Sequence, residues 1–266
     1  MNGIVLLTRP SNWQGVLTLL ECSRRGVPVA GVIVEPKTSA DRVQRLRKFL
    51  AANGLLDTAR KVWLTALSER RFSAEIGRAG LETLPRTVTE MAAQLGVTVY
   101  QVASHNDSEC EATLRRLDPD VILLAGTRII KPHIIGRARI GCLNAHTGWL
   151  PQYRGVHANL WALLEGGPRG VTVHYVDPGV DTGAILLQEE LPVLAGDTLE
   201  RLEVRTMQLC ARLMLDAVQG VTNGSLAGRP QYSHEGRHYR AMAFRNEREV
   251  RRLLRRLPAA PSGVNP

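Results

Sequence analysis

The sequence lacks the motifs by which several large enzyme classes are recognised. Neither Gly-x-Gly-x-x-Gly nor Gly-x-x-x-x-Gly-Lys-Ser/Thr occurs in its 266 residues, which removes the main support for a dinucleotide-dependent dehydrogenase or a P-loop enzyme. No stretch approaches the roughly 20 apolar residues that span a bilayer. The opening residues 1–7 are too short for a signal peptide and have no basic lead. We therefore expect a cytoplasmic protein without membrane contact.

Cysteines are few: four are scattered along the chain, with no Cys-x-x-Cys pair. This usage predicts buried, reduced thiols. The His-Glu-x-x-His pattern of zinc proteases occurs at His234–His238. That pattern places both histidines on a helix, whereas Gly236 and the turn-rich residues 228–233 predict a loop or irregular strand. We therefore expect no metal.

The net charge of +9 is unevenly distributed. Segment 36–96 carries eleven Lys and Arg against six Asp and Glu, and segment 229–266 carries nine against three. The excess positive charge therefore belongs to these two segments and not to the central body. A solvated basic face is the simplest interpretation, and attraction of an anionic substrate, a carrier protein or a membrane surface is the alternative.

Strand-like runs alternate with helical patterns, which predicts an α/β fold with a mostly parallel sheet flanked by helices. The expected strands are 4–8, 27–34, 97–102, 121–125, 140–145, 171–176 and 185–191. The expected helices are 13–24, 107–117, 157–165 and 199–218. Segment 36–96 is too long for an α/β connection and has a helical pattern, so we expect a basic helical insertion. We expect the chain to divide into a main domain over 1–226, a basic C-terminal extension over 227–257 and a disordered tail over 258–266.

The polar residues with the clearest chemical pattern lie in 141–188. An apolar strand ends in Asn144-Ala-His146, and residues two apart point to the same side of a strand. The Asn144 amide and the His146 imidazole can therefore face one pocket at the carboxyl end of the strand, where open α/β sheets bind ligands. Asp181 follows in the glycine-bracketed turn 177–183. An Asn, a His and an Asp on converging segments indicate acyl-group chemistry.

Two stretches carry a resemblance to a known family. Segments 143–155, LNAHTGWLPQYRG, and 170–188, GVTVHYVDPGVDTGAILLQ, resemble in order and spacing the formyltransferases that use 10-formyltetrahydrofolate. That group includes glycinamide ribonucleotide, methionyl-tRNA and sugar-amine N-formyltransferases and formyltetrahydrofolate hydrolase. The broader resemblance covers about 97–220. It implies a Rossmann-like formyltransferase fold, a transferase activity in one-carbon metabolism, and 10-formyltetrahydrofolate as co-substrate.

The resemblance also implies roles for individual residues. The family's Asn-x-His corresponds to Asn144 and His146, and its loop aspartate to Asp181. The implied folate-binding residues are Ala125, Gly126, Thr127, Arg128, Ile129, Ile130, Val176, Asp177, Gly179 and Asp181. The candidate substrate-binding residues are Ser11, Asn12, Tyr153, Arg154, His157 and His174. Tyr153 and Arg154 are equally suited to fixing their turn, and His174 to an internal role in its strand.

In this chemistry a substrate amine attacks the formyl carbon and produces a tetrahedral intermediate with a negative oxygen. Asn144 can donate an amide N–H to that oxygen, a role worth roughly 3 kcal/mol in comparable sites. His146 has a near-neutral ordinary pKa that suits proton transfer. Asp181 can orient the imidazole and help carry the amine proton to the leaving nitrogen. The residues alone leave the division between His146 and Asp181 open.

Departures from the family narrow the expected acceptor. Residues 8–12, TRPSN, replace the glycine- and serine-rich loop that binds ribose phosphate, which argues against glycinamide ribonucleotide. The residues beyond 226 are too few for the C-terminal barrel of the tRNA enzyme, and we expect no regulatory domain of the hydrolase type. We therefore expect a small-molecule primary amine as partner (an amino sugar, an amino acid or a natural-product intermediate) and no nucleic acid, and a homodimer is compatible with the sequence. A 10-formyltetrahydrofolate hydrolase and a nucleic-acid-binding module are the alternatives.

Overall fold

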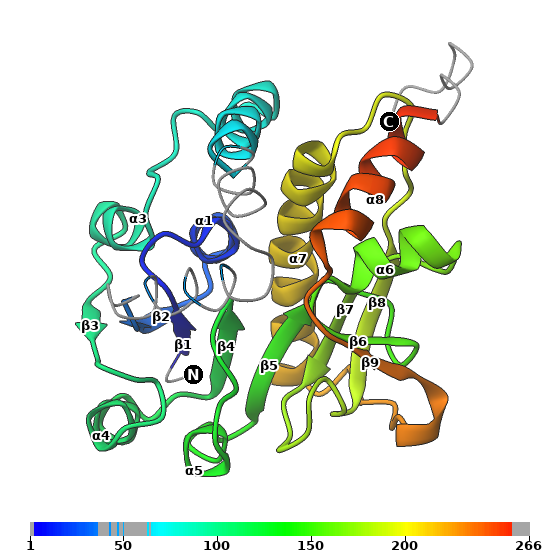
Figure 1. Cartoon of the computed structure of the whole chain (residues 1–266). Helices are drawn as coiled ribbons and strands as arrows, with labels where there is room; N and C mark the ends of the chain where they lie inside the picture. Colours follow the sequence, from blue (N-terminus) through cyan, green and yellow to red (C-terminus); the bar gives the residue numbers. More distant parts are fainter. Residues whose placement is uncertain are drawn as a thin grey trace.

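A computed structural model describes residues 3–36, 43, 47, 50, 63 and 65–256. A seven-stranded sheet runs through the molecule in the order β3-β2-β1-β4-β5-β7-β8 (Figure 1). Its strands are β1 Ile4–Thr8, β2 Val29–Val34, β3 Val99–Gln101, β4 Val121–Ala125, β5 Gly141–His146, β7 Gly170–Tyr175 and β8 Ile185–Glu190. The strands from β3 to β5 are parallel, and β7 and β8 continue the sheet antiparallel. The predicted mostly parallel α/β sheet is confirmed.

Both faces of the sheet are covered by helices, which explains why the central strands are apolar throughout. In β1, Ile4 and Leu6 join the core on one face, while Val5 and Leu7 join the core on the other, and all four are at most 1% exposed. The first face packs against α1 Trp13–Arg24, α3 Val88–Gln94 and α7 Leu199–Thr222. The second packs against α4 Ser108–Leu117 and α5 Pro132–Ile135. The four cysteines are free and buried in these layers, as predicted.

Short polar side chains fix where the helices begin. Asn12 accepts from Gly15 N at 2.9 Å, and Asp107 from Cys110 N at 2.8 Å, so each satisfies a donor of the first helical turn. Thr198 caps α7 in the same way. The predicted helix 157–165 begins one residue later, as α6 Ala158–Glu165, because His157 is its N-cap with a left-handed φ of 61°. Within the described residues, no helix is long and apolar enough to cross a membrane.

Within the described residues of segment 36–96, helix α3 and a second helix over 65–78 differ in kind. Helix α3 connects β2 to β3 and packs against α1, so it is the crossover helix of a β-α-β unit. The second helix contributes Phe72 and Ile76 to a small core with Leu17. It is also joined to α7, where Ser68 donates to Glu200 at 2.7 Å. Most of the expected helical insertion before residue 65 lies outside the described residues.

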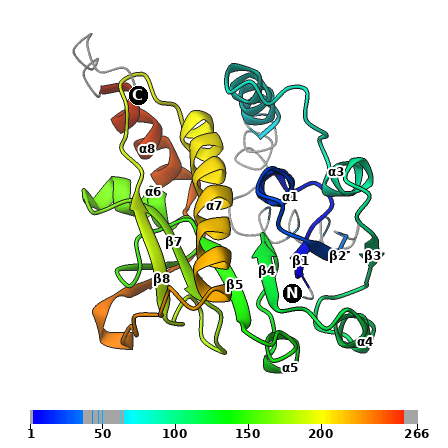
Figure 2. The same cartoon turned by 180° about the vertical axis from the view of Figure 1, so that it is seen from behind.

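After α7 the chain returns across the β5–β8 half of the sheet as a segment that we call the strap, residues 228–242. It contains a 3-10 turn, Ser233–Glu235, and β9 Arg237–Tyr239, which pairs in parallel with β6 Tyr153–Gly155. The strap leads into α8 Phe244–Arg256, which buries Val250 and Leu254 and lies on the side of α7 opposite to α1 (Figures 1 and 2). Sequence analysis predicted only a basic extension over 227–257, without these elements.

Candidate active site

Four polar side chains, from β5, β7 and the turn after β7, meet at the carboxyl end of β5. We call Asn144, His146, His174 and Asp181 the catalytic cluster. Asn144 and His174 are opposite each other in the antiparallel β5–β7 pair, and opposite residues share a face. The Asn144 Nδ2 lies 3.2 Å from the His174 Nε2. The alternation that predicted Asn144 and His146 on one side therefore brings in His174 from the neighbouring strand.

Asp181 supplies the carboxylate that both histidines approach. Its Oδ2 lies 3.4 Å from the His146 Nδ1, and its Oδ1 lies 3.6 Å from the His174 Nε2. The Gly155 N–H donates to Oδ2 at 2.8 Å. Asp181 has a φ of 54°, a left-handed conformation that is uncommon for a residue other than glycine. The turn thus adopts an unfavourable backbone conformation in order to direct this carboxylate at the two imidazoles.

Backbone carbonyls determine which ring nitrogens carry hydrogen. The His146 Nε2 lies 2.8 Å from the Tyr153 carbonyl, and the His174 Nδ1 lies 2.7 Å from the Tyr175 carbonyl. A carbonyl oxygen can only accept, so both nitrogens must be donors. In a neutral His174 the other nitrogen, Nε2, is then an acceptor, and it receives one N–H of the Asn144 amide.

The pKa values of His146 and Asp181 are both lowered, but for different reasons. Burial lowers the pKa of His146, and this outweighs the opposing attraction of Asp181. Burial by itself raises the pKa of Asp181, but His174, His146 and the Gly155 N–H together bring it down to about 2. At neutral pH the cluster therefore combines an ionised carboxylate with a neutral His146.

The members of the catalytic cluster differ in their access to solvent. The side chains of His146 and His174 are 6% and 3% exposed, that of Asp181 is 14% exposed, and Asn144 is partly exposed. A molecule arriving at the cluster can therefore meet Asn144 and Asp181, while the two imidazoles lie behind them.

Gly148 makes room for the His146 ring and was missed by sequence analysis. A Cβ atom at Gly148 would lie 2.6 Å from the His146 Nε2 and 2.4 Å from the Ala158 Cβ. Its carbonyl accepts from the Thr172 Oγ1 at 2.8 Å, which holds this turn against β7. The only available signal was a glycine two residues beyond a candidate catalytic histidine.

The first predicted folate-binding stretch, 125–130, leaves the end of β4 beside the end of β1. Gly126 is left-handed, with a φ of 64°, and a Cβ there would lie 2.1 Å from the Asn12 Nδ2, so a side chain would strain the backbone and displace Asn12. Ala125 and Ile130 are buried, and Thr127 is partly exposed. Ile129 is 69% exposed, and the Arg128 Nε lies 2.9 Å from the Glu35 Oε1. Gly126 and Ile129 therefore remain available to a ligand.

The second predicted folate-binding stretch, 176–181, is held by its own side chains. The Asp177 Oδ1 accepts from the Gly179 N at 3.1 Å and from the Thr182 Oγ1 at 2.6 Å, so this carboxylate shapes the turn. Val176 donates its N–H to the Cys142 carbonyl at 2.8 Å, which joins the start of the turn to β5. The backbone of the turn is what this stretch can offer a ligand.

The predicted substrate-binding residues divide into two groups. Ser11 and His157 are exposed, and the His157 Nδ1 accepts from the Met242 N at 3.1 Å. Asn12 caps α1 and contacts Gly126. Tyr153 and Arg154 are buried against the strap: the Tyr153 ring stacks on Tyr239 at 5.3 Å, and the Arg154 Nη2 donates to the Tyr232 carbonyl at 2.8 Å. Of the two roles considered for them, fixing the turn is the one the structure supports.

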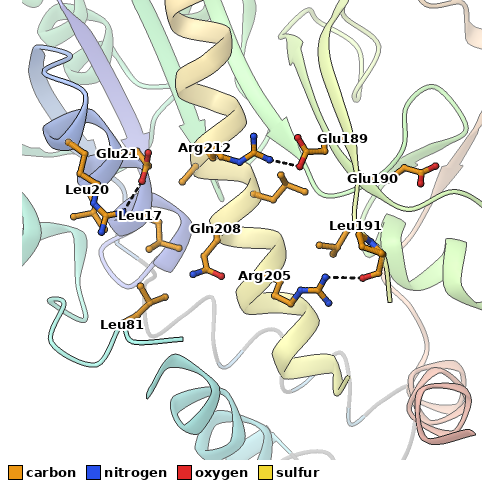
Figure 3. Close-up of a pocket in the computed structure, with 14 residues that line it drawn as sticks. Leu17, Leu20, Glu21, Leu81, Glu189, Glu190, Leu191, Arg205, Gln208 and Arg212 are labelled. Atoms are coloured by element: carbon orange, nitrogen blue, oxygen red, sulfur yellow. Dashed lines mark hydrogen bonds and ion pairs between the residues drawn. The ribbon is translucent and has the colours of Figure 1, made fainter. Parts of the chain in front are cut away.

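A cavity of about 410 Å³ lies on the α1 and α7 side of the sheet and contains no member of the catalytic cluster. It straddles α7 between α1 and the end of β8 (Figure 3). Its charged rim is paired internally, for example Arg212 with Glu189 and Arg24 with Glu21. This cavity is therefore separate from the polar cluster at the carboxyl end of β5.

The His-Glu-x-x-His pattern does not build a metal site. Ser233–Glu235 is a single 3-10 turn and Arg237–Tyr239 is a strand, so His234 and His238 do not share a helix, as predicted. Across the described ranges, no group of three His, Cys, Asp or Glu residues is arranged to hold a metal ion.

Comparisons with known proteins identify the family of this chain. A family model described as formyl transferase matches residues 1–218. The chain is 35% identical to a methionyl-tRNA formyltransferase of Chlorobium phaeovibrioides over 146 residues, which are 54% of this chain and 46% of that one. The chain spans about half the length of the curated relatives it matches.

Solved structures share the fold. Glycinamide ribonucleotide transformylase 1 of Symbiobacterium toebii aligns with a TM-score of 0.57 at 23% identity, covering 84% of this chain and 88% of that one. An N-formyltransferase of Helicobacter canadensis, solved with folinic acid and dTDP-3-aminofucose, aligns with a TM-score of 0.57 at 18% identity, covering 90% and 71%. At these identities the likeness shows the formyltransferase fold, as the resemblance implied.

Proposed function

The chain belongs to the formyl transferase family, and we propose that it transfers the formyl group of 10-formyltetrahydrofolate to a primary amine of a small molecule. The observation that carries this proposal is the catalytic cluster. An amide donor and an ionised carboxylate lie together at the carboxyl end of β5, with two buried imidazoles behind them. This set offers both oxyanion stabilisation and proton transfer, which acyl transfer to an amine requires.

We assign the steps as follows. The amine nitrogen forms a bond to the formyl carbon, and the carbonyl oxygen takes the negative charge. Asn144 donates to that oxygen the amide hydrogen that His174 does not receive. The bond from the formyl carbon to the folate nitrogen then breaks, and the proton lost by the amine passes to that leaving nitrogen. The products are a formamide and tetrahydrofolate.

Within these steps we assign the proton transfer to Asp181 and a positioning role to His146. Asp181 is the more exposed of the two and is ionised at neutral pH, so it can receive a proton from the attacking amine. Both nitrogens of His146 already face protein groups, the Tyr153 carbonyl and the Asp181 carboxylate. In neutral His146 the hydrogen is on Nε2, so Nδ1 can donate to Asp181 only after it takes up a proton. His146 therefore acts through Asp181 and not by direct contact with a substrate.

The folate donor is supported by the chain's own residues as well as by the family. Because Gly126 has no side chain, the backbone after β4 is accessible beside exposed Ile129, which suits a flat heteroaromatic ring. The backbone of the Asp177–Gly179 turn would form the other wall. The relative from Helicobacter canadensis was solved with folinic acid, a formyl-bearing folate.

The direct test incubates the full chain with 10-formyltetrahydrofolate and a panel of amino sugars, nucleotide-linked amino sugars and amino acids. Mass spectrometry should detect one product heavier by a single carbonyl group, together with one equivalent of tetrahydrofolate. Release of formate without any added amine would instead identify a hydrolase of the donor. If folded protein gives neither product, the proposed function is wrong.

A second candidate acceptor is the amino group of methionyl-tRNA. Relatives about 35% identical are named methionyl-tRNA formyltransferases, and α8 exposes Arg245, Arg248, Arg252, Arg255 and Arg256. The earlier prediction that no nucleic acid is a partner is therefore not confirmed. Methionyl-tRNA therefore belongs in the panel beside free methionine. If only the charged tRNA is formylated, and this activity weakens steeply with salt, methionyl-tRNA replaces the small molecule as the proposed acceptor.

The cytoplasmic location and the homodimer stay predictions.

A further inference from the structure

The turn that carries Asp181 is held from outside by the strap, which lies beyond the residues matched by the family model. The Gln231 Nε2 donates to the Asp181 carbonyl at 3.1 Å and to the Gly183 carbonyl at 2.6 Å. The Gln231 Oε1 accepts from the Arg154 Nη2 at 3.1 Å. A single amide therefore connects the Asp181 turn to the segment that follows β5.

The strap fixes Gln231 on both sides by backbone contacts. Before it, Arg229 exchanges hydrogen bonds with Ile185 at 2.7 and 2.8 Å, which attaches the strap to β8. After it, the Tyr232 carbonyl accepts from Arg154 at 2.8 Å, and Arg237 donates its N–H to the Gln152 carbonyl at 3.0 Å. Gln231 thus reaches the Asp181 turn from a backbone that is anchored to β8 and to the β6 region.

The Asp181 turn needs an external contact of this kind because its backbone is unfavourable. Asp181 is left-handed, and Gly183 is so close to the Tyr175 carbonyl that a Cβ there would lie 1.9 Å from it. The two N–H groups of the Gln231 amide hold the 181–182 and 183–184 peptide planes through the Asp181 and Gly183 carbonyls. The direction of the Asp181 carboxylate toward His146 and His174 depends on those planes.

We propose that Gln231 is a positioning residue for Asp181 and that the strap is an integral part of the active site. This inference rests on the proposed function only for its kinetic consequences. The contact itself predicts that Gln231 maintains the electrostatic surroundings of both histidines, whatever the reaction is.

The test compares Gln231→Leu and Gln231→Glu with the wild-type chain. The leucine variant removes all three hydrogen bonds, whereas the glutamate variant retains an acceptor for Arg154 and loses the donors to residues 181 and 183. We expect both variants to lower kcat by about ten- to a hundredfold, because a displacement near 1 Å at a reacting group can cost about a hundredfold. KM for both substrates should change much less. Gln219→Leu, at an exposed position of α7, is the matched control.

Two further readouts separate positioning from a general loss of stability. The acidic limb of the kcat–pH profile should move to higher pH, since a displaced Asp181 loses part of the contacts that lower its pKa. In an NMR titration, the midpoint of the His146 ring protons should shift in both Gln231 variants and not in Gln219→Leu. Wild-type kcat and unchanged titrations in Gln231→Leu would overturn the inference. Near-normal kcat in Gln231→Glu alone would overturn it too, since Gln231 would then serve only Arg154. If the chain formylates no amine, the NMR titrations still decide the role of Gln231.

Discussion

Two histidine–carboxylate pairs lie at the carboxyl end of the sheet and are close to copies of each other in geometry. In one, the His146 Nδ1 lies 3.4 Å from Asp181, and its Nε2 lies 2.8 Å from a backbone carbonyl. In the other, the His105 Nδ1 lies 3.4 Å from Glu35, and its Nε2 lies 3.2 Å from the Ile33 carbonyl. Burial lowers the pKa of both histidines.

The two carboxylates differ in what else they contact. Glu35 accepts from the His105 N at 2.9 Å and pairs with the Arg128 guanidinium, which holds the predicted folate-binding stretch after β4. Asp181 instead faces a second imidazole and lies beside the partly exposed amide of Asn144. A buried histidine next to a carboxylate therefore does not by itself indicate a catalytic pair. The neighbouring groups decide whether the pair holds a loop or acts on a substrate.

The largest expected difference between the pairs is in turnover. Asp181→Asn keeps the shape and removes the charge, so we expect kcat to fall by about a thousandfold, within the range of general acid–base effects. Glu35→Gln is the same chemical change at the other pair, and its kcat should stay within a few fold of wild type. Steady-state kinetics with the formylated product as readout checks both variants. Equal losses of kcat in the two variants would contradict the assignment of turnover to the Asp181 pair alone.

Loss of the oxyanion donor should be the next largest effect. Asn144→Ala removes the amide placed beside Asp181, and we expect kcat to fall by about 10²–10³-fold, as for other oxyanion donors. KM should change little, because the contact strengthens only as the oxygen becomes negative. Asn223→Ala, at the C-cap of α7, is the control. A variant that raises KM and leaves kcat intact would place Asn144 in ground-state binding instead.

At the Glu35 pair the expected effect is on donor binding and stability. Glu35→Gln weakens the contact with Arg128, so KM for 10-formyltetrahydrofolate should rise several fold while KM for the amine stays constant. The free energy of unfolding should fall by about 1–3 kcal/mol, as when a buried charged partner is removed. Urea unfolding and donor titration at fixed amine measure the two quantities. A change confined to the amine would contradict the assignment of 125–130 to the donor.

The smallest expected effect concerns pH and is shared by the two pairs. Both histidines have folded-state pKa values below the unfolded value of about 6.5, so below that pH the unfolded chain binds protons that the folded chain does not. The free energy of unfolding should therefore decrease from pH 7.5 to pH 5.5. His105→Gln and His146→Gln should each reduce this decrease, whereas His133→Gln, at an exposed position, should not. Unfolding curves at the two pH values give this decrease. If the decrease in both variants equals that of the wild type, the linkage is refuted.

Sequence reasoning succeeded where a local pattern determines the structure. Continuous apolar runs predicted strands such as Val121–Ala125, and the period of two placed Asn144 and His146 on one face. It failed at the strap because β6 and β9 have three residues each and pair across some 80 residues of chain, so neither shows a period of its own. Tyr153 and Arg154 were compatible with substrate contact for the same reason, since the residues that bury them are distant in the sequence.

The strap also sets a practical limit on how this enzyme can be recombined with its relatives. Sequence similarity to the family model ends at residue 218, inside α7 and before Gln231. A chimera joined at that point would combine an Asp181 turn from one parent with supporting contacts from another. Exchange of acceptor specificity between family members should therefore succeed more often when the crossover falls after Met242, so that the turn and its support are inherited together.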